Sequence, residues 1–300
     1  MTTAGARGTV VQGRGLVPLA LLSLVVTTAL WGGTFVIVKG AIRLASPVDF
    51  LAVRFLIAFV VLATLRPRRV LRLSRDGLVR GALLGLTLGG AYLAQTYGQQ
   101  YTSASMSGFI TGMSVVFTPI IAGLVFRHRI GSMIWCAAAV ATAGLAVMTL
   151  HGFTVGPGEG LTVLCALFFA VHLIALSEWS TAQDAYGLTV VQLGVIGLLC
   201  LALGSPGGLD LPADEGFWAA VIGLAIVATA AGYLVQTWAQ AHLPASVAAV
   251  VLTLEPLFAG VFGVLVDHDE LSGRIVAGGA MVVGAMCLAE FRSSPSPSKA

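Results

Sequence analysis

The sequence predicts an all-α membrane protein in which ten transmembrane helices form two inverted five-helix repeats. Three observations predict this fold class: an apolar composition, the number of long apolar stretches, and a motif that occurs twice. Hydrophobic residues make up 57% of the 300 residues and charged residues only 10%, whereas a soluble domain carries roughly 25% charged residues. We therefore expect an integral membrane protein with little soluble structure.

Ten apolar stretches are long enough to cross a bilayer as helices, which takes about 20 residues each. They cover approximately residues 17–39, 48–65, 78–98, 103–126, 131–150, 158–177, 187–204, 216–239, 244–266 and 273–291. The first stretch continues past Trp31 to Lys39 without a convincing cleavage site, so we interpret it as a span rather than a secretory signal. The four cysteines lie in apolar stretches without a CxxC pair, which indicates packing roles rather than disulfides or a metal site.

The motif that occurs twice runs from Tyr92 to Gln99 and returns almost unchanged from Tyr233 to Gln240. The offset is 141 residues (233 − 92), close to half of the chain. Because each copy holds five spans, an odd number, the second copy must insert upside down relative to the first. Inverted repeats of this kind place a binding site near the membrane midplane, between the two halves.

The distribution of basic residues predicts the orientation, because such residues flank spans mainly on the cytoplasmic side. If the N-terminus lies inside, the inner segments carry Arg7, Arg14, Arg66, Arg68, Arg69, Arg72, Arg75, Arg80, Arg127, Arg129, Arg292 and Lys299. The outer segments hold only Arg43 and Arg274, together with most of the loop carboxylates. We expect a multi-pass plasma-membrane protein with both termini cytoplasmic, and we interpret the arginine-rich loop at 66–75 as a topology determinant rather than a nucleic-acid site.

These patterns divide the chain into four parts. We expect a cytoplasmic N-terminal tail over residues 1–16, a first five-helix repeat over 17–150, a second over 151–291, and a disordered cytoplasmic tail over 292–300. The last part is rich in serine and proline, a composition that cannot bury enough apolar surface to fold.

Several motifs point to one family. They are Trp31-Gly32-Gly33-Thr34-Phe35 followed by Lys39, Pro47 and Arg54; the run from Gln99 to Ser105 followed by Phe109-Ile110-Thr111-Gly112; and the run from Leu254 to Phe258 ahead of Glu270-Leu271. Their order and spacing resemble the EamA type of the drug/metabolite transporter superfamily, from about residue 20 to 290. The resemblance implies a ten-helix secondary carrier, commonly an exporter of amino acids, other metabolites or drugs. Arg129 replaces a glutamate that is frequent in the family, and Gln192 is the residue of the seventh span that corresponds to Arg54. We therefore do not expect the two halves to be strictly symmetric in function.

Polar side chains inside the predicted spans tend to face protein or a water-filled cavity, because hydrocarbon cannot satisfy them. The residues that we expect to bind the substrate are Trp31, Tyr92, Gln95, Thr111, His172, Tyr233 and Gln236. On the third span Tyr92 and Gln95 share one helical face, and their copies Tyr233 and Gln236 share a face on the eighth. Their rings and amides would form two symmetry-related walls around a polar substrate. The alternative is that they form hydrogen bonds between helices and hold the bundle together.

Three of these residues have alternatives of their own. Trp31 would stack on a substrate or close a gate, or it would be a packing residue. His172 lies in the middle of the sixth span and would titrate or donate to a substrate, or it would be a hydrogen-bonded bundle residue. Thr111 belongs to a hydroxyl stripe that would also allow close helix packing. The stripe consists of Ser103, Ser107, Thr111, Ser114 and Thr118.

Arg54 and Glu255 lie well inside the second and ninth spans, and we assign them to coupling or gating. Pro256 follows Glu255 and lacks an amide hydrogen, so it interrupts the helix. A carboxyl group there could bind a coupling proton, or it could be a fixed ion-pair partner or a structural group. Arg54 would bind a substrate anion or act as an internal counter-ion. Lys39 lies near the outer surface, where we expect its side chain to reach the lipid headgroups.

The sequence argues against several classes of function. It lacks a GxxxxGK[ST] phosphate loop and contains only two lysines, Lys39 and Lys299, so we expect no ATP hydrolysis. It also lacks HExxH and GxSxG motifs, and we expect no catalytic residue, no cofactor and no metal. The main hypothesis is a secondary active transporter that exports small organic metabolites or drugs by alternating access, with proton coupling as one option. The alternatives are an intramembrane enzyme and a non-transporting receptor or channel.

The expected partners follow from this hypothesis. They are a small-molecule substrate and the lipid bilayer, with no nucleic acid, and the sequence is compatible with a monomer or a homodimer. The predicted mixture of rings, amides and hydroxyls suits a small zwitterion or an amphipathic organic compound better than an inorganic ion.

Overall fold

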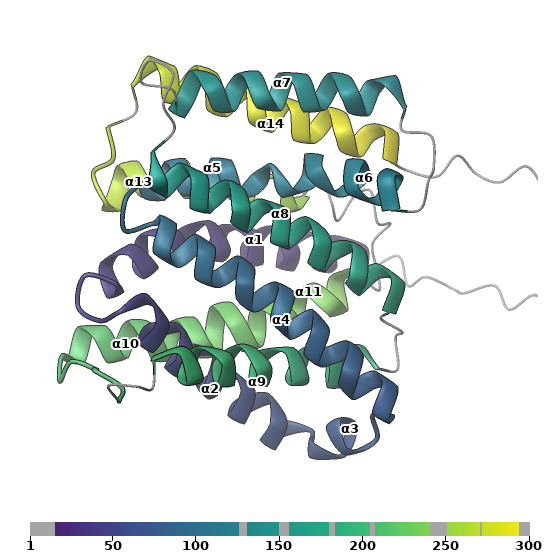
Figure 1. Ribbon diagram of the computed structural model, residues 1–300, viewed down its shortest axis with the longest axis vertical. Coiled ribbons are helices and arrows are strands. Elements are labelled where there is room, and N and C mark those ends of the chain that lie inside the picture. The colour runs from purple at the N-terminus through teal and green to yellow at the C-terminus, as the bar shows by residue number, and fades with distance from the viewer. Residues whose placement is uncertain are drawn as a thin grey trace, which may run out of the picture.

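The computed structural model describes residues 16–125, 131–149, 156–179, 184–204, 208–240, 251–270 and 272–293. These segments are helical and contain no strand, and the helices lie side by side in one elongated bundle (Figure 1). Seven helical stretches among them are long and apolar enough to cross a membrane. Three shorter apolar helices accompany them: Ser132–Val147, Glu255–Val266 and Gly273–Leu288. The prediction of an all-α membrane protein with many spans is therefore confirmed.

The two halves of the chain contain corresponding elements, although α3 has no counterpart among the described helices of the second half. The first half contains α1 (Leu16–Ala41), α2 (Pro47–Leu65), α3 (Pro67–Leu71), α4 (Arg75–Gly98), α5 (Ala104–Gly112), α6 (Ser114–Val125) and α7 (Ser132–Thr149). The second half contains α8 (Pro157–Trp179), α9 (Ala185–Gly204), α10 (Glu215–Gly223), η2 (Leu224–Ala231), α11 (Gly232–Gln240), α13 (Glu255–Val266) and α14 (Gly273–Ser293). The N-terminal ends of α2, α4, α5 and α10 are fixed by side-chain oxygens that accept a backbone N–H. The capping residues are Ser46, Ser74, Ser103 and Asp214.

Some sequence predictions fall on segments outside this description. The span expected from residue 244 is described only from residue 251, and Arg127 and Arg129 lie outside the described residues. The two predicted tails also lie almost wholly outside them.

Two predicted spans are interrupted, one at Met113 without a signal in the sequence and one near Pro256, where the sequence indicated a break. The stretch 103–126 is divided at Met113 into α5 and α6, and a turn at Thr253 and Leu254 precedes α13. These breaks are equivalent in the two repeats, because 113 + 141 = 254. The stretch 216–239 contains the π-helix η2, whereas its counterpart α4 is a regular α-helix. Interrupted helices at corresponding positions of two repeats are typical of transporter binding sites.

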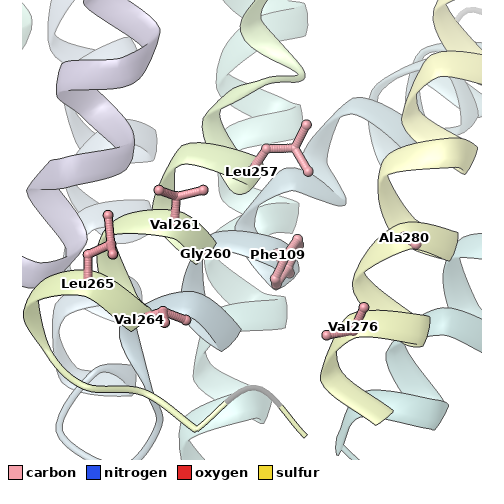
Figure 2. Close-up of a pocket in the computed structure, with 8 residues that line it drawn as sticks. All are labelled: Phe109, Leu257, Gly260, Val261, Val264, Leu265, Val276 and Ala280. Carbon is pink, nitrogen blue, oxygen red and sulfur yellow. The ribbon is translucent and has the colours of Figure 1, made fainter. Parts of the chain in front are cut away.

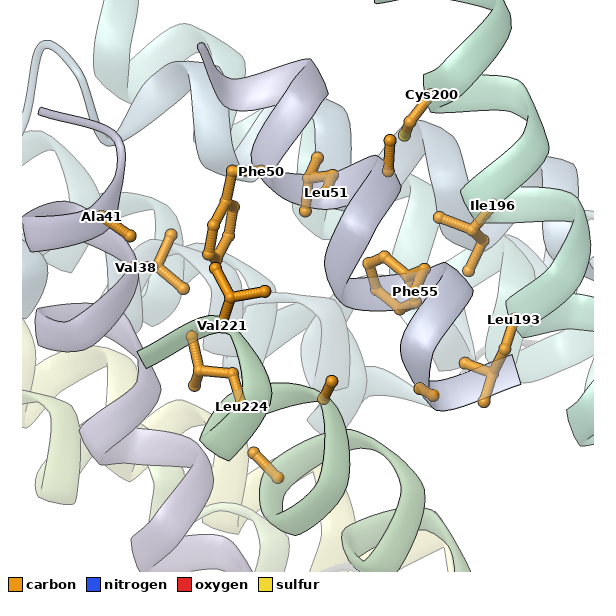
Figure 3. Packing of buried hydrophobic residues seen from close by; sticks show 14 of the residues in the cluster. Val38, Ala41, Phe50, Leu51, Phe55, Leu193, Ile196, Cys200, Val221 and Leu224 are labelled. Atoms are coloured by element: carbon orange, nitrogen blue, oxygen red, sulfur yellow. The ribbon is translucent and has the colours of Figure 1, made fainter. Parts of the chain in front are cut away.

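The halves interlock in the bundle. Helices α7 and α14 pack together at one end of its long axis, while α2, α3 and α9 lie at the other end (Figure 1). Between these ends α1 packs on α13, and α4 packs on α8 and α9, so each half contacts the other. The largest apolar cluster joins α2, α9 and α10, with Phe50 and Phe55 of α2 close to Ile196 and Val221 (Figure 3).

Small residues allow the close approach of α4 and α9. A Cβ atom on Gly81 would lie 2.9 Å from a methyl group of Val191, and one on Gly85 would lie 2.8 Å from Cβ of Val195. Any larger residue would push these helices apart, so the glycines spaced by four residues on α4 form a packing groove. This contact between the halves sets the position of the polar face of α4.

Candidate functional site

A cavity of about 180 Å³ lies between the two halves of the chain. It is lined by Trp31, Thr34, Phe35, Arg54, Leu88, Tyr92, Gln95, Ser114, Val115, Phe169, His172, Leu173, Leu176, Tyr233, Gln236, Leu252 and Glu255. All the site residues predicted from the sequence line it except Thr111. The cavity therefore brings together residues from seven helices that are far apart in the chain.

Tyrosines from the two repeats meet at this cavity. The hydroxyl oxygens of Tyr92 and Tyr233 lie 3.2 Å apart, within hydrogen-bonding distance. The ring of Tyr233 also packs against Trp31, with 5.7 Å between the ring centroids. The ring of Tyr92 packs edge-on against Phe55 at 4.8 Å and Phe169 at 5.7 Å. An aromatic wall of this kind offers ring faces to a ligand at low entropic cost, because its rotamers are already fixed.

Trp31 is held in place by the π-helix. Its indole Nε1 donates a hydrogen bond of 2.7 Å to the carbonyl oxygen of Ala228 in η2. A Cβ atom on Gly232 would lie 2.8 Å from that Nε1, so the glycine leaves room for the indole. The wide turns of a π-helix change the direction of its carbonyl groups, which makes one available to a side chain. Trp31 therefore has a fixed orientation at the edge of the cavity.

Arg54 places a positive charge in the wall of the cavity. Its side chain is only 4% exposed, and its Nε donates to the hydroxyl of Thr229 at 3.1 Å. The guanidinium carbon lies 5.4 Å from the centre of the Phe55 ring and 5.5 Å from that of Tyr92, within cation–π range. Within the described residues Arg54 forms no salt bridge. Its guanidinium can therefore bind an anionic group that enters the cavity.

Glu255 lines the same cavity and is the first residue of α13. Gly32 determines how closely this end of α13 approaches α1. A Cβ atom on Gly32 would lie 2.8 Å from the backbone nitrogen of Ala259 and 2.9 Å from the carbonyl oxygen of Glu255. The Trp31-Gly32 pair thus has two roles: the tryptophan contributes to the wall, and the glycine lets α13 bring Glu255 to it.

Gln95 and Thr111 contact each other. The amide Nε2 of Gln95 donates to the hydroxyl of Thr111 at 3.2 Å, and Gln95 itself lines the cavity. Thr111 is 8% exposed and does not line it. Thr111 is therefore the one predicted substrate-binding residue that does not line this cavity: its hydroxyl accepts a hydrogen bond from the amide of Gln95 on α4, and its contact with a substrate stays a prediction. From the same hydroxyl stripe, Ser114 is the residue that lines the cavity.

His172 on α8 is anchored to α4. Its Nδ1 lies 3.2 Å from the carbonyl oxygen of Leu84 and 3.4 Å from the hydroxyl of Thr87. Because a carbonyl group can only accept, Nδ1 carries a hydrogen in this arrangement, and Nε2 of the neutral ring is then an acceptor. The ring is therefore bonded within the bundle and also lines the cavity, and its role towards a substrate stays a prediction.

A charged cluster connects the halves beyond one end of the cavity. This Lys39 cluster consists of Lys39, Arg43, Ser105, Asp267 and Asp269. The Nζ of Lys39 lies 2.8 Å from Oδ2 of Asp267 and 3.9 Å from Oδ1 of Asp269. The guanidinium of Arg43 lies 3.3 Å from Oδ1 of Asp267, and Asp269 accepts from the backbone N–H and the hydroxyl of Ser105 at 2.9 and 2.7 Å. The expectation that Lys39 reaches the lipid headgroups is therefore wrong, because two carboxylates of the second repeat bind it.

The end of α13 presents these carboxylates. The backbone N–H groups of Asp267 and Asp269 both donate to the carbonyl of Gly263, and His268 between them has a φ of 55°. A left-handed residue directly after a helix reverses the chain, and both aspartates here then face α1 and the start of α5. Lys39 lies five residues beyond Thr34 of the cavity wall, about 7.5 Å along the helix at roughly 1.5 Å per residue.

A second cavity, of about 470 Å³, differs in chemistry. It lies between α5, α13 and α14, and the described residues that line it are Phe109, Leu257, Gly260, Val261, Val264, Leu265, Val276 and Ala280 (Figure 2). This lining offers no polar or charged side chain. The smaller cavity is therefore the candidate site for a polar ligand.

Some parts of the site gave no distinct signal in the sequence. The apolar lining residues Leu88, Phe169, Leu173, Leu176 and Leu252 look like any other residues of an apolar span. Thr229, the partner of Arg54, is a single threonine in a run of small residues. The Lys39 cluster did have a signal, since Lys39, Asp267 and Asp269 were all expected at the outer surface, where opposite charges could meet.

Comparisons with known proteins agree with this architecture. The EamA-like transporter family model matches the chain twice, over residues 18–150 and 156–290, which confirms the internal repeat. The chain is 28% identical over 272 residues to an uncharacterized transporter of Archaeoglobus fulgidus, covering 90% of this chain and 85% of the relative. It is 25% identical over 286 residues to the uncharacterized transporter YvbV of Bacillus subtilis, covering 91% and 92%. A solved crystal structure with 18% identity matches with a TM-score of 0.62 over 91% of this chain and 96% of the other, a likeness of fold alone.

Proposed function

Since the chain belongs to the EamA-like transporter family, we propose that it is a secondary active transporter that moves small organic compounds by alternating access. The observation that carries this proposal is the meeting of Tyr92 and Tyr233 at the cavity. These residues occupy the same position in the two repeats, so the cavity lies on the axis that relates the halves. A site on that axis can be exposed to either side of the membrane when the halves rock against each other.

The proposed topology has ten spans with both termini in the cytoplasm of a plasma-membrane protein. The seven long helical stretches and the three shorter apolar helices support this number, because together they supply five elements per repeat. The arginine-rich segment around α3 supports the orientation through the positive-inside bias.

The lining of the cavity supports a small zwitterionic or amphipathic substrate. Arg54 offers a positive charge without a salt-bridge partner in the described part of the chain, and Glu255 offers a carboxyl group. Phe169, Leu173 and Leu176 add an apolar surface. The volume of about 180 Å³ is below the range of pockets for drug-sized ligands, which begins at roughly 300 Å³. This favours a small metabolite such as an amino acid over a larger drug.

Alternating access requires an end that closes and opens again. The Lys39 cluster supports this part of the proposal, because it joins α1 and α5 of the first repeat to the end of α13 in the second. We place it at the outer end of the cavity. Opening towards the outside would separate Lys39 from Asp267 and Asp269. Glu255, at the break before α13, is the candidate proton-binding group that would couple this motion to a gradient.

The experiment that tests the proposal is counterflow in proteoliposomes. The purified protein is first screened by thermal shift against amino acids and related metabolites, and stabilising compounds are then assayed for flux. A carrier shows saturable uptake that is accelerated by substrate on the opposite side. If a folded, ligand-stabilised protein gave only non-saturable flux or none, a channel or a receptor would replace the carrier. Chemical conversion of the bound compound would indicate an enzyme.

A further inference from the structure

Five exposed arginines lie in α3 or directly beside it in the chain, at the end of the bundle opposite α7 and α14 (Figure 1). This arginine surface consists of Arg66, Arg68, Arg69, Arg72 and Arg75. Within the described residues none of the five forms a salt bridge, whereas nearby Arg80 pairs with Asp76 at 3.1 Å. The surface therefore carries five positive charges that the described part of the protein does not neutralise.

The segment that carries these charges is fixed to the bundle. Val70 packs into the apolar cluster of α2 and α9, and Leu73 packs on Gly187, where a Cβ atom would lie 2.7 Å from the leucine side chain. The guanidinium of Arg66 lies 5.9 Å from the ring centre of Tyr186, whose hydroxyl donates to the carbonyl of Leu62 at 2.6 Å. A segment that served only to set the orientation during insertion would need no such anchoring. The arginines are held as a preorganised surface.

Two leucines beside the arginines are turned outwards. Leu65, at the end of α2, is 63% exposed, and Leu71, at the end of α3, is 83% exposed. Their place directly after a membrane-spanning helix puts them where headgroups meet acyl chains. This boundary offers hydrocarbon on one side and phosphate on the other. Exposed leucines can contact the hydrocarbon, and the arginines, which form no salt bridge in the described part of the chain, can bind the phosphate.

We propose that the arginine surface around α3 binds the headgroups of anionic phospholipids, with Leu65 and Leu71 inserted beside the acyl chains. The guanidinium groups donate hydrogen bonds to the headgroup phosphates, a geometry for which arginine is better suited than lysine. Charge complementarity selects the lipid: a net negative headgroup such as phosphatidylglycerol is bound, and zwitterionic phosphatidylcholine is not. This inference is independent of the transport proposal, because it concerns a surface outside the cavity.

The test is lipid binding by the purified full-length protein. Native mass spectrometry in detergent counts bound phosphatidylglycerol and phosphatidylcholine at equal concentrations. Wild-type protein is expected to prefer phosphatidylglycerol, and added salt is expected to abolish the preference. The triple variant R68Q/R69Q/R72Q is expected to lose roughly fivefold in affinity for phosphatidylglycerol per arginine removed. The variant R68K/R69K/R72K is expected to retain most of the preference, because it keeps the charge.

Arg274→Gln is the control, because Arg274 is an exposed arginine that donates to the Val147 carbonyl at the α7–α14 end. It should bind phosphatidylglycerol as the wild type does. Equal binding of the two lipids by wild-type protein would overturn the proposal, as would a preference that persists in high salt or in the triple glutamine variant. The wild-type and salt measurements remain decisive if the triple variant fails to fold.

Discussion

Tyr92 and Tyr233 contact each other through hydroxyl groups 3.2 Å apart, although 141 residues separate them in the chain. That separation equals the offset of the duplicated motif, so each tyrosine is the copy of the other. In the proposed inverted-repeat arrangement, the axis that relates the repeats would pass between these two oxygen atoms in the wall of the cavity. Each tyrosine contacts its own copy, so a change in either repeat affects the same contact. This property makes the pair suitable for a mutational test.

We expect Tyr92→Phe and Tyr233→Phe each to lower the free energy of unfolding by about 0.5–1.5 kcal/mol, because each removes the same hydrogen bond. The double variant should be about as stable as the single variants, since each single change already removes the hydrogen bond between the two hydroxyl groups. Substrate affinity should fall a few-fold in each. Thermal unfolding and ligand titration measure the two effects, with Tyr101→Phe as the control because this tyrosine is 62% exposed. Lower stability with unchanged affinity in all three variants would show that the tyrosines only hold the helices together.

The second prediction concerns Glu255. Its carboxyl group is the candidate site of the coupling proton, and glutamine has the same shape but cannot take up or release a proton. Glu255→Gln should abolish accumulation of substrate under an imposed pH gradient while it retains binding and exchange. Glu270→Gln, a change in an exposed loop residue, is the control and should transport normally. Accumulation by Glu255→Gln at the wild-type rate would assign Glu255 a structural role.

The third prediction concerns the Lys39 cluster. Asp267→Asn removes the charge that binds both Lys39 and Arg43, and a hydrogen bond to a charged group contributes roughly 1.5–3 kcal/mol. The state that is open to the outside should therefore gain population. A cysteine at Ser114 in the cavity wall, in a background without native cysteines, should react faster with an impermeant reagent added from outside. Asp76→Asn, which breaks the exposed pair with Arg80, should leave the rate unchanged. An unchanged rate in Asp267→Asn would contradict the gating role.

The fourth prediction concerns the packing of α1 on α13. In Gly32→Ala the new methyl group would meet backbone atoms of Glu255 and Ala259 within 3 Å, and overpacking of this kind costs about 1–3 kcal/mol. The melting temperature should fall and transport should decrease, because Glu255 is displaced. Gly40→Ala on the same helix is the matched control, since a Cβ atom there meets nothing within 4 Å. Equal melting temperatures for the two variants would show that α13 can shift without cost.

The fifth prediction concerns topology. Cysteines placed at Ser74 and Asp210, both of which are exposed, should be labelled by an impermeant reagent from opposite sides of the membrane. Ser74 precedes α4 in the predicted cytoplasmic segment, and Asp210 precedes α10 in the predicted outer segment. Labelling of both positions from outside intact cells would contradict the proposed topology and remove the basis for inverted repeats.

Sequence reasoning located most of the cavity because its polar residues contrast with apolar spans. Tyr92, Gln95 and their copies are conspicuous among leucines and alanines, and the spacing of the copies predicted two symmetry-related walls of one cavity. Thr111 shows the limit of this approach, since a hydroxyl on the correct helix can face a neighbouring side chain instead of the cavity. Whether a side chain faces the cavity depends on the rotation of its helix about the helix axis by a few degrees. Packing determines this rotation, and the spacing of residues does not specify it.

The helix breaks and the Lys39 cluster show a different limit. The sequence indicated the break near Pro256 through the missing amide hydrogen, but Met113 gave no signal in the first repeat. The contact of Lys39 with Asp267 joins residues 228 positions apart (267 − 39), and it depends on how the end of α13 turns at His268. Such contacts follow from tertiary structure and are not encoded in local periodicity.

The Lys39 cluster also breaks the equivalence of the two repeats. Moving Lys39 by 141 residues leads to Ser180, and moving Asp267 and Asp269 by the same offset leads to Phe126 and His128, so the pairing of Lys39 with two aspartates is not repeated at the equivalent positions of the sequence. Perfectly duplicated halves would make the inward-open and outward-open forms of a carrier equal in free energy. An ion-pair cluster that forms in only one of the two states would remove that degeneracy, and each difference of about 1.4 kcal/mol is a tenfold bias in population. Under the proposed alternating-access mechanism, divergence between the copies would give the duplicated scaffold a preferred resting state, and a coupling gradient would act for or against that preference.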